Sequence, residues 1–171
     1  PLVSKMAQSY GKKETFIISQ CISIIGYVLF WFLFVPGKPY MFLFALPFFS
    51  FGIGGLFTLM MSMTADACDY EELRKGLPRK EGSFGAIYWW MIKLGTALAG
   101  LLSGFIMYYV GFAGDASTQP EGALTGLRIA YSTIPVVGTL FAIYVMRDYE
   151  IDEQRAAEIK KQLSQRNEGA N

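Results

Sequence analysis

One lysine of this sequence lies deep inside a long apolar stretch. Residues 84–112 contain a single charged side chain, that of Lys93. Helical rise would carry Lys93 ~14 Å into the stretch, close to the middle of a ~30 Å hydrocarbon core. A charge at that depth is costly, so we expect Lys93 to face a protein interior or a watery cavity and to pair with an acid outside this sequence. A purely structural ion pair is the alternative to a functional role.

Aromatic and hydroxyl side chains flank Lys93 at helical spacing. Trp89 lies about one turn before Lys93, Thr96 lies about one turn after it, and Tyr88 adjoins this stripe. Rings stack on the C–H faces of a sugar, while hydroxyl and charged groups bond its hydroxyls, so this set predicts a sugar cavity. The alternative for Tyr88 and Trp89 is an aromatic belt at the membrane surface.

Acidic and basic residues also meet across a short turn that follows the second apolar stretch. Asp66 and Asp69 are three residues apart, so a helix would place them on one face. Arg79 follows them across a Gly-Leu-Pro turn. Opposite charges at this place can hold one conformation closed, which makes Asp66, Asp69 and Arg79 candidate gate residues. The alternative is a solvated loop, whose exposed pairs contribute only ~0–1 kcal/mol each.

Composition excludes several classes of function. The sequence has no His, which excludes a His-based triad and a His-ligated metal site. Its two cysteines, Cys21 and Cys68, cannot build a disulfide framework. With 53% hydrophobic residues, 17% charged residues and a net charge of +1, the chain is neither a disordered segment nor a nucleic-acid binder with a basic face. The apolar stretches hold no clustered nucleophile and base, so we do not expect an enzyme.

Four stretches are long and apolar enough to cross a membrane as helices. Residues 16–35, 41–64 and 129–146 carry no charge, and residues 84–112 carry one. A helix needs about 20 apolar residues to cross the hydrocarbon core, whereas strands of a membrane barrel would alternate in ~10-residue units. Helices of a soluble bundle would each need a polar face, which these stretches lack. The predicted fold class is an all-α integral membrane protein.

Lysine and arginine gather at alternate connections between these stretches. Of the 15, Lys38 and Arg128 lie in one set of connections, Lys93 lies inside a stretch, and the remaining twelve lie in the other set. By the positive-inside rule, both ends and the middle connection face the cytoplasm, and we expect the plasma (bacterial inner) membrane. The predicted organisation is the cytoplasmic end of a preceding helix and loop (1–15), membrane helices (16–35, 40–65, 84–112 and 127–146), a cytoplasmic loop (66–83), an external loop (113–126) and a cytoplasmic, helix-prone tail (147–171).

Small residues recur within two of these stretches. They are Gly52, Gly54 and Gly55 in the second stretch and Gly95, Gly100 and Gly104 in the third. Small residues let membrane helices approach closely, so we expect tight helix packing at both places. Flexing of these helices is the alternative.

The charged residues and Lys93 together form a recognisable pattern. Asp66-Ala-Cys-Asp69-Tyr70 is followed by Gly76-Leu-Pro-Arg79-Lys-Glu81-Gly82 and then by Lys93-Leu-Gly95. This order and spacing resembles the glycoside–pentoside–hexuronide:cation symporters, the melibiose-carrier-like family of the major facilitator superfamily. The resemblance runs nearly end to end.

The resemblance implies a twelve-helix fold, of which this chain would hold the end of helix 8 and helices 9–12. By resemblance, Lys93 lies at the substrate and cation cavity, and Asp66, Asp69 and Arg79 belong to the cytoplasmic gate. The melibiose carrier has small or amide residues at the positions of Tyr88 and Trp89, which argues against melibiose itself as the substrate.

The predicted function is the C-terminal portion of a cation-coupled sugar or glycoside symporter that works by alternating access. Its expected partners are the sugar or glycoside, the lipid bilayer and the missing N-terminal portion of the same protein, with Na⁺ or H⁺ co-transported. No cofactor, metal or nucleic acid is expected. The alternative is a self-contained four-helix membrane protein that acts as an interaction or assembly subunit, which would leave Lys93 without an acid.

Overall fold

The computed structural model describes residues 2–35, 37–38, 40–76, 78–112, 114, 119–120 and 122–168. Every regular element in these ranges is helical. The elements are α1 (Leu2–Tyr10), α2 (Lys12–Leu33), the 3₁₀ helix η1 (Met41–Phe44), α3 (Leu46–Lys75), α4 (Glu81–Tyr109), α5 (Ala123–Met146) and α6 (Glu153–Glu168). Part of the predicted external loop at 113–126, namely residues 113, 115–118 and 121, lies outside the described residues.

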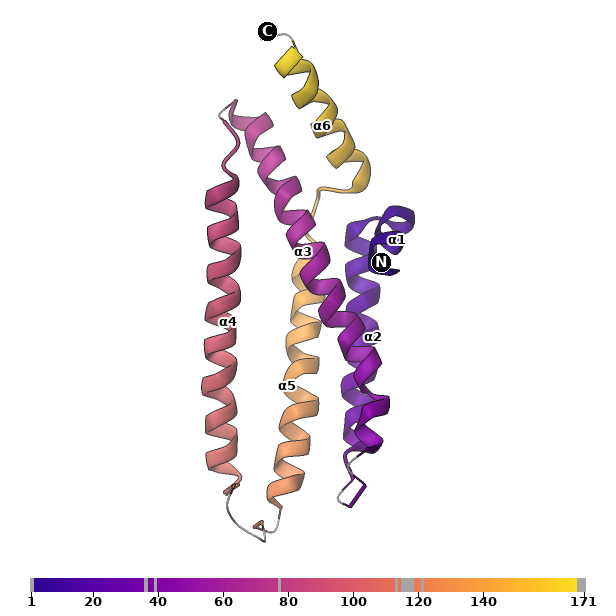
Figure 1. Cartoon of the computed structure of the whole chain (residues 1–171), viewed down its shortest axis with the longest axis vertical. Coiled ribbons are helices and arrows are strands. Elements are labelled where there is room, and N and C mark those ends of the chain that lie inside the picture. The colour runs from indigo at the N-terminus through magenta and orange to yellow at the C-terminus, as the bar shows by residue number, and fades with distance from the viewer. Residues whose placement is uncertain are drawn as a thin grey trace.

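Within the described ranges, four helices are long and apolar enough to cross a membrane, namely α2, α3, α4 and α5. The prediction of an all-α chain with four membrane helices and a C-terminal helix is therefore confirmed. The helices run alternately up and down, and α1, α6 and the α3–α4 connection lie at one end of the bundle (Figure 1). We call this the charged end, formed by α1, α6 and residues 66–83.

The helices are packed unevenly. Helix α2 packs against both α3 and α5, whereas α4 touches mainly α3 and stands beside the other helices (Figure 1). None of the residues of α4, all of which the structure describes, is buried. Among the four membrane helices, the close contacts are therefore those of α2 with α3 and of α2 with α5.

The closest contact is the crossing of α2 and α3. A methyl group added at Gly52 would lie 2.4 Å from Cβ of Ser23, and one added at Gly55 would lie 2.6 Å from Oγ of Ser19. Buried Gln20 donates a hydrogen bond from Nε2 to the carbonyl of Gly52 at 3.1 Å. The expected tight packing thus holds for Gly52 and Gly55.

The same expectation fails for the glycines of α4 within this chain. A methyl group added at Gly95, Gly100 or Gly104 would meet no described atom within 4 Å. The physical reason is that α4 stands apart from α5, so its small residues face no helix among the described residues.

The predicted loop at 66–83 is wrong for residues 66–75, which continue α3 as a helix. The prediction ended the helix where the apolar run ended, but a helix can continue into water when its polar residues support it. The Glu71 and Lys75 side chains form an ion pair one turn apart. The helix ends at Gly76, which adopts a left-handed conformation with φ +66° and donates its N–H to the Glu72 carbonyl at 3.0 Å.

Other helix boundaries differ from the prediction by a few residues. Helices α2, α4 and α5 each begin before the predicted residues 16, 84 and 127, because their first turns are polar or small rather than apolar. The second membrane segment, predicted from residue 40, starts as η1, and α3 itself begins at Leu46. Pro47 occupies the first turn of α3, where a missing N–H is tolerated.

The apolar core lies toward the charged end. Phe16 of α2, Leu59 and Met63 of α3, and Met146 of α5 are buried together. Beside this core, Nζ of Lys13 donates hydrogen bonds to the carbonyls of Arg147 at 2.6 Å and Tyr149 at 3.0 Å. The lysine therefore satisfies carbonyl groups at the end of α5 and ties α2 to the chain that leads into α6.

Candidate functional site

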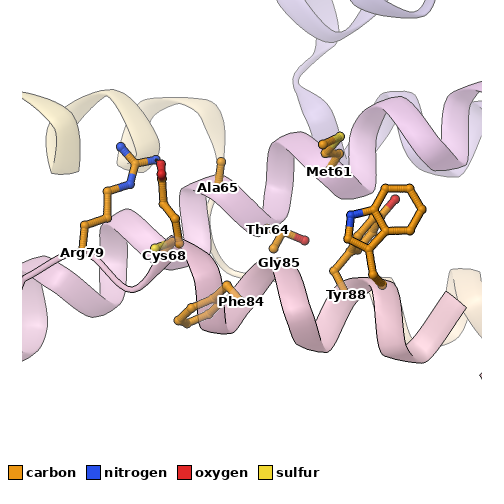
Figure 2. Close-up of a pocket in the computed structure, with 10 residues that line it drawn as sticks. Met61, Thr64, Ala65, Cys68, Arg79, Phe84, Gly85 and Tyr88 are labelled. Atoms are coloured by element: carbon orange, nitrogen blue, oxygen red, sulfur yellow. The ribbon is translucent and has the colours of Figure 1, made fainter. Parts of the chain in front are cut away.

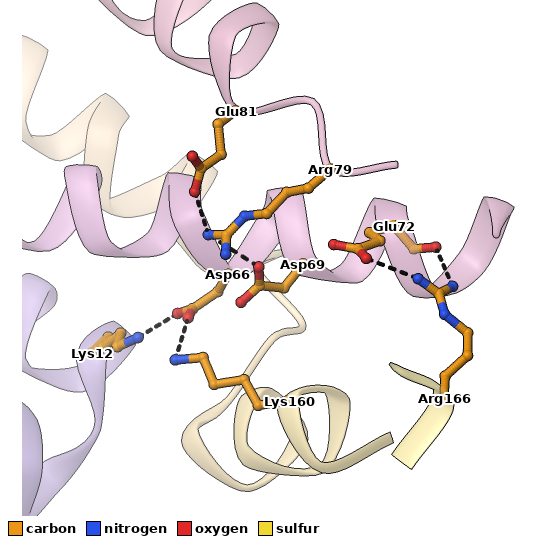
Figure 3. A network of polar contacts seen from close by, with 8 residues as sticks. All are labelled: Lys12, Asp66, Asp69, Glu72, Arg79, Glu81, Lys160 and Arg166. Carbon is orange, nitrogen blue, oxygen red and sulfur yellow. Dashed lines mark hydrogen bonds and ion pairs between the residues drawn. The ribbon is translucent and has the colours of Figure 1, made fainter. Parts of the chain in front are cut away.

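Three carboxylates line one edge of α3 at the charged end (Figure 3). Asp66, Asp69 and Glu72 follow one another at intervals of three residues, which the helix brings to one side. We call these three residues the acidic edge. Each one contacts a cation from a different part of the chain, so the acidic edge joins several elements.

Asp66 is the most enclosed of the three, with a residue exposure of 3%. Its carboxylate forms an ion pair with Lys12 of α2 and a longer contact of 3.7 Å with Nζ of Lys160 of α6. A buried carboxylate is costly unless it is paired, and lysines from two helices meet that requirement here. Asp66 is thus the point at which α2, α3 and α6 are joined.

The phenol of Tyr149 lies in the electrostatic field of this carboxylate. Burial raises the pKa of Tyr149 to about 12, and the negative charges of Asp66 and Glu153 add to the shift. The phenolic oxygen is buried and finds no hydrogen-bond partner among the described residues. The surroundings of Asp66 therefore favour the neutral phenol.

Asp69 pairs with Arg79, the arginine predicted to belong to the gate. The Nη2 atom of Arg79 lies 3.2 Å from Oδ1 of Asp69 and 2.8 Å from Oε1 of Glu81 (Figure 3). The contact with Asp69 is a charge contact without hydrogen-bond geometry at Oδ1. The structure therefore brings Arg79 to Asp69 but pairs Asp66 with lysines instead.

Five residues of this cluster were not among the predicted site residues, namely Lys12, Glu72, Glu81, Lys160 and Arg166. Nη2 of Arg166 lies 2.8 Å from Oε1 of Glu72. A usable signal was present, because Asp66 and Glu72 are six residues apart and so are Lys160 and Arg166. Two helices lying side by side in register match these spacings.

A pocket of about 190 Å³ lies between α3 and α4 next to the charged cluster (Figure 2). Its lining comes from Met61, Thr64, Ala65 and Cys68 of α3, from Phe84, Gly85, Tyr88 and Trp89 of α4, and from Arg79 and Glu81. The rings of Tyr88 and Trp89 meet edge to face, with centroids 5.5 Å apart. Predicted cavity and gate residues therefore share one pocket.

Lys93 and Thr96 lie farther along α4 and do not line this pocket. Lys93 is exposed, and within the part of the chain that the structure describes no carboxylate forms an ion pair with it. The hydroxyl of Thr96 donates to the carbonyl of Ile92 at 2.8 Å. The structure thus places Arg79 and Tyr88 at opposite ends of one pocket, with Trp89 also in its lining, whereas Lys93 lies outside it (Figure 2).

The described residues offer no metal centre. Across the described ranges, no three Cys, Asp or Glu side chains come together as a site for a metal ion would require. The chemistry available at the site is therefore charge pairing along the acidic edge and ring stacking in the adjacent pocket.

Comparison with known proteins gives one family and several relatives. The family described as MFS/sugar transport protein matches residues 1–153. The glucuronide carrier protein homolog of Escherichia coli (strain K12) is 30% identical over 166 residues, which are 97% of this chain and 36% of that protein. The isoprimeverose transporter of Lactiplantibacillus pentosus is 25% identical over 94% of this chain and 34% of its own length. No solved structure matches this chain.

These matches have a consistent extent. An uncharacterized symporter of Bacillus subtilis (strain 168), YjmB, is 26% identical over 95% of this chain and 35% of its own length. The chain therefore spans about a third of the length of the curated relatives it matches. The match over residues 1–153 covers all four membrane helices and the acidic edge, so the chain belongs to the MFS/sugar transport protein family.

Proposed function

We propose that this chain forms part of a cation-coupled symporter for a sugar or glycoside that works by alternating access. The observation that carries the proposal is the shared pocket between α3 and α4, which is lined by the rings of Tyr88 and Trp89 and also by Arg79 of the charged end. Alternating access requires a binding region beside a closure that can break and re-form. Ion pairs at the end of membrane helices suit such a closure, because their partners can exchange.

Each predicted residue has a role in this proposal. Tyr88 and Trp89 stack on the sugar ring, and the hydroxyl of Thr96 bonds a sugar hydroxyl. Lys93 pairs with an acidic cation site when that site is empty and releases it when Na⁺ or H⁺ binds. Asp66, Asp69 and Arg79 form part of the gate on the cytoplasmic side.

An uptake assay on the protein produced from its own gene tests the function. Cells or proteoliposomes are supplied with labelled glucuronides, isoprimeverose and simple galactosides, with and without Na⁺ and with the pH gradient collapsed. We expect accumulation of at least one sugar that depends on one of the two ions. Accumulation that ignores both gradients would contradict coupling, and no uptake of any sugar would contradict the substrate class.

Replacing Lys93 tests its role in coupling. Lys93→Val removes the charge and leaves an apolar side chain that suits an apolar helix. We expect ion-driven accumulation to fall by about tenfold or more, because the charge pairing at the coupling step is lost. Lys161→Val, at an exposed position of α6, is the matched control and should accumulate normally. Unaltered coupled uptake in Lys93→Val would show that the assigned role is wrong.

Replacing Arg79 separates gating from binding. Arg79→Gln breaks the contacts with Asp69 and Glu81, so we expect the turnover rate to fall several-fold, about three to ten, while the apparent affinity for the sugar changes less. Arg74→Gln is the control, because Arg74 is exposed near the end of α3, five residues before Arg79. A normal rate with lost affinity would assign Arg79 to binding instead.

A further inference from the structure

Helix α6 lies against the cytoplasmic-side extension of α3 and buries a short apolar seam there. Ala156, Ile159 and Leu163 are exposed by only 6%, 4% and 8%. Their spacing of three and four residues places them on one face of α6. Among the described helices, α3 is the one against which α6 packs.

Two cations of α6 extend this seam to the acidic edge. Nζ of Lys160 lies 3.7 Å from Oδ1 of Asp66, and Nη2 of Arg166 lies 2.8 Å from Oε1 of Glu72 (Figure 3). Arg166 also donates to the backbone carbonyl of Glu72 at 3.3 Å. Because both pairs are six residues apart, they form together when α6 is in register and are lost together when it shifts.

The attachment is suited to reversal. The carboxylates of Asp66 and Glu72 are largely enclosed, but the side chains of Lys160 and Arg166 remain 60% and 37% exposed, and the Lys160 contact is long at 3.7 Å. Water therefore reaches the cationic partners and can replace them when α6 leaves. The seam holds only three apolar side chains. Lys13 holds the carbonyls of Arg147 and Tyr149, but residues 150–152, which follow them and lead into α6, contain no helix and allow α6 to move as a unit.

We infer that α6 is a reversible latch on the acidic edge: docked, it holds the end of α3 beside α2, and its release lets that end move when the bundle opens. The link to opening rests on the proposed transport function. Asp66 explains why the latch reaches α2, since the same carboxylate also pairs with Lys12. Release removes one of two cations from Asp66 and leaves Lys12 as its partner.

Thiol labelling tests the latch without any sugar. The protein from its own gene, carrying Ala156→Cys, is placed in lipid nanodiscs and treated with a water-soluble maleimide, and the labelled peptides are quantified by mass spectrometry. The introduced thiol reports docking of α6. Cys68, buried on α3 beside Arg79, reports movement of α3. Cys21 lies inside the membrane helix α2 and should stay unlabelled in every variant.

The latch variant combines Lys160→Glu with Arg166→Glu. We expect labelling of the introduced thiol to rise by about tenfold or more, and labelling of Cys68 by about threefold or more, because local opening exposes both sites. Lys161→Glu, a single charge reversal at the neighbouring exposed position, should alter either rate by less than about twofold. Unchanged labelling of the introduced thiol would show that these pairs do not hold α6.

Two further outcomes complete the test. Faster labelling of the introduced thiol with unchanged Cys68 would overturn the latch, because α6 would then dock without restraining α3. A further variant combines Arg166→Glu with Glu72→Arg, which exchanges the two charges of this ion pair. If the charge reversal acts through a general loss of folding, this exchange should fail to protect the introduced thiol from labelling. Restored protection in that swapped pair supports the latch, and a failed uptake assay would leave this result standing.

Discussion

At the residue scale, the charged end is arranged around Asp66. This carboxylate contacts lysines from two helices, and it lies close enough to Tyr149 to contribute to the raised pKa of that phenol. Charges in such surroundings interact more strongly than charges in water, because few solvent dipoles screen them. A single substitution here is therefore felt by several neighbours.

The raised pKa of Tyr149 predicts a pH dependence of stability. Its pKa rises from 10.0 to about 12 on folding, so the stabilisation from the neutral phenol is complete below pH 10 and is lost as the pH rises through the folded value. We expect the melting temperature in detergent to fall between pH 10 and pH 12 and to fall less in Tyr149→Phe. Tyr144→Phe, at an exposed site on α5, is the control. Equal slopes for Tyr149→Phe and the parent would contradict the assignment.

At the scale of elements, the crossing of α2 and α3 positions the acidic edge. Glycines on α3 face serines on α2, and Gln20 adds a hydrogen bond to the Gly52 carbonyl. Lipid gives apolar helices little reason to associate, so close backbone contact and polar bonds hold them together. The crossing lies about three to four turns from Asp66 along α3, so it helps to set where the carboxylates meet Lys12.

Adding a methyl group on either side of α3 tests the crossing. Gly52→Ala places Cβ 2.4 Å from Cβ of Ser23, and we expect it to destabilise the fold by ~1–3 kcal/mol. Gly54→Ala meets no described atom within 4 Å and should be neutral or stabilising by up to ~1 kcal/mol, because alanine favours a helix. Thermal unfolding in detergent measures both. Equal effects of the two substitutions would show that the crossing is not sterically tight.

At the scale of the whole molecule, charge and packing are both one-sided. Twelve of the 15 lysines and arginines lie outside the membrane stretches at the end that carries α1 and α6. Packing is uneven as well, because none of the residues of α4 is buried. The first asymmetry predicts orientation in the membrane. The second is consistent with the extent of the matches, since the chain spans about a third of the curated relatives.

Orientation can be measured with a reagent that does not cross membranes. Tyr40→Cys lies between α2 and α3, and Lys161→Cys lies on α6 at the opposite end. In intact cells we expect a membrane-impermeant maleimide to label Tyr40→Cys and to leave Lys161→Cys unlabelled until the cells are permeabilised, because the positive end is retained inside. The reverse pattern would invert the topology.

The amino-acid sequence alone determined the membrane class, the four spans, the concentration of positive charge on one side and the family resemblance. Each of these depends on local composition or on motif order along the chain. A run of about 20 apolar residues crosses the bilayer whichever neighbours it has. Four residues keep roles that remain predictions, namely Lys93, Thr96, Tyr88 and Trp89. Their roles concern a sugar, a cation and an acidic partner, none of which belongs to the contacts within this chain.

Only the tertiary structure decided which charges meet. Lys12 and Asp66 are 54 residues apart in the chain, and Glu72 and Arg166 are 94 apart, so no local pattern pairs them. Their pairing depends on how closely α2 and α3 cross and on the register in which α6 docks. The continuation of α3 as a helix to Lys75 also matters for this pairing. It places the three carboxylates of the acidic edge along one side of a helix, where the sequence predicted a loop. Contacts of this kind follow from the shapes of packed side chains, which act across helices and not along the sequence.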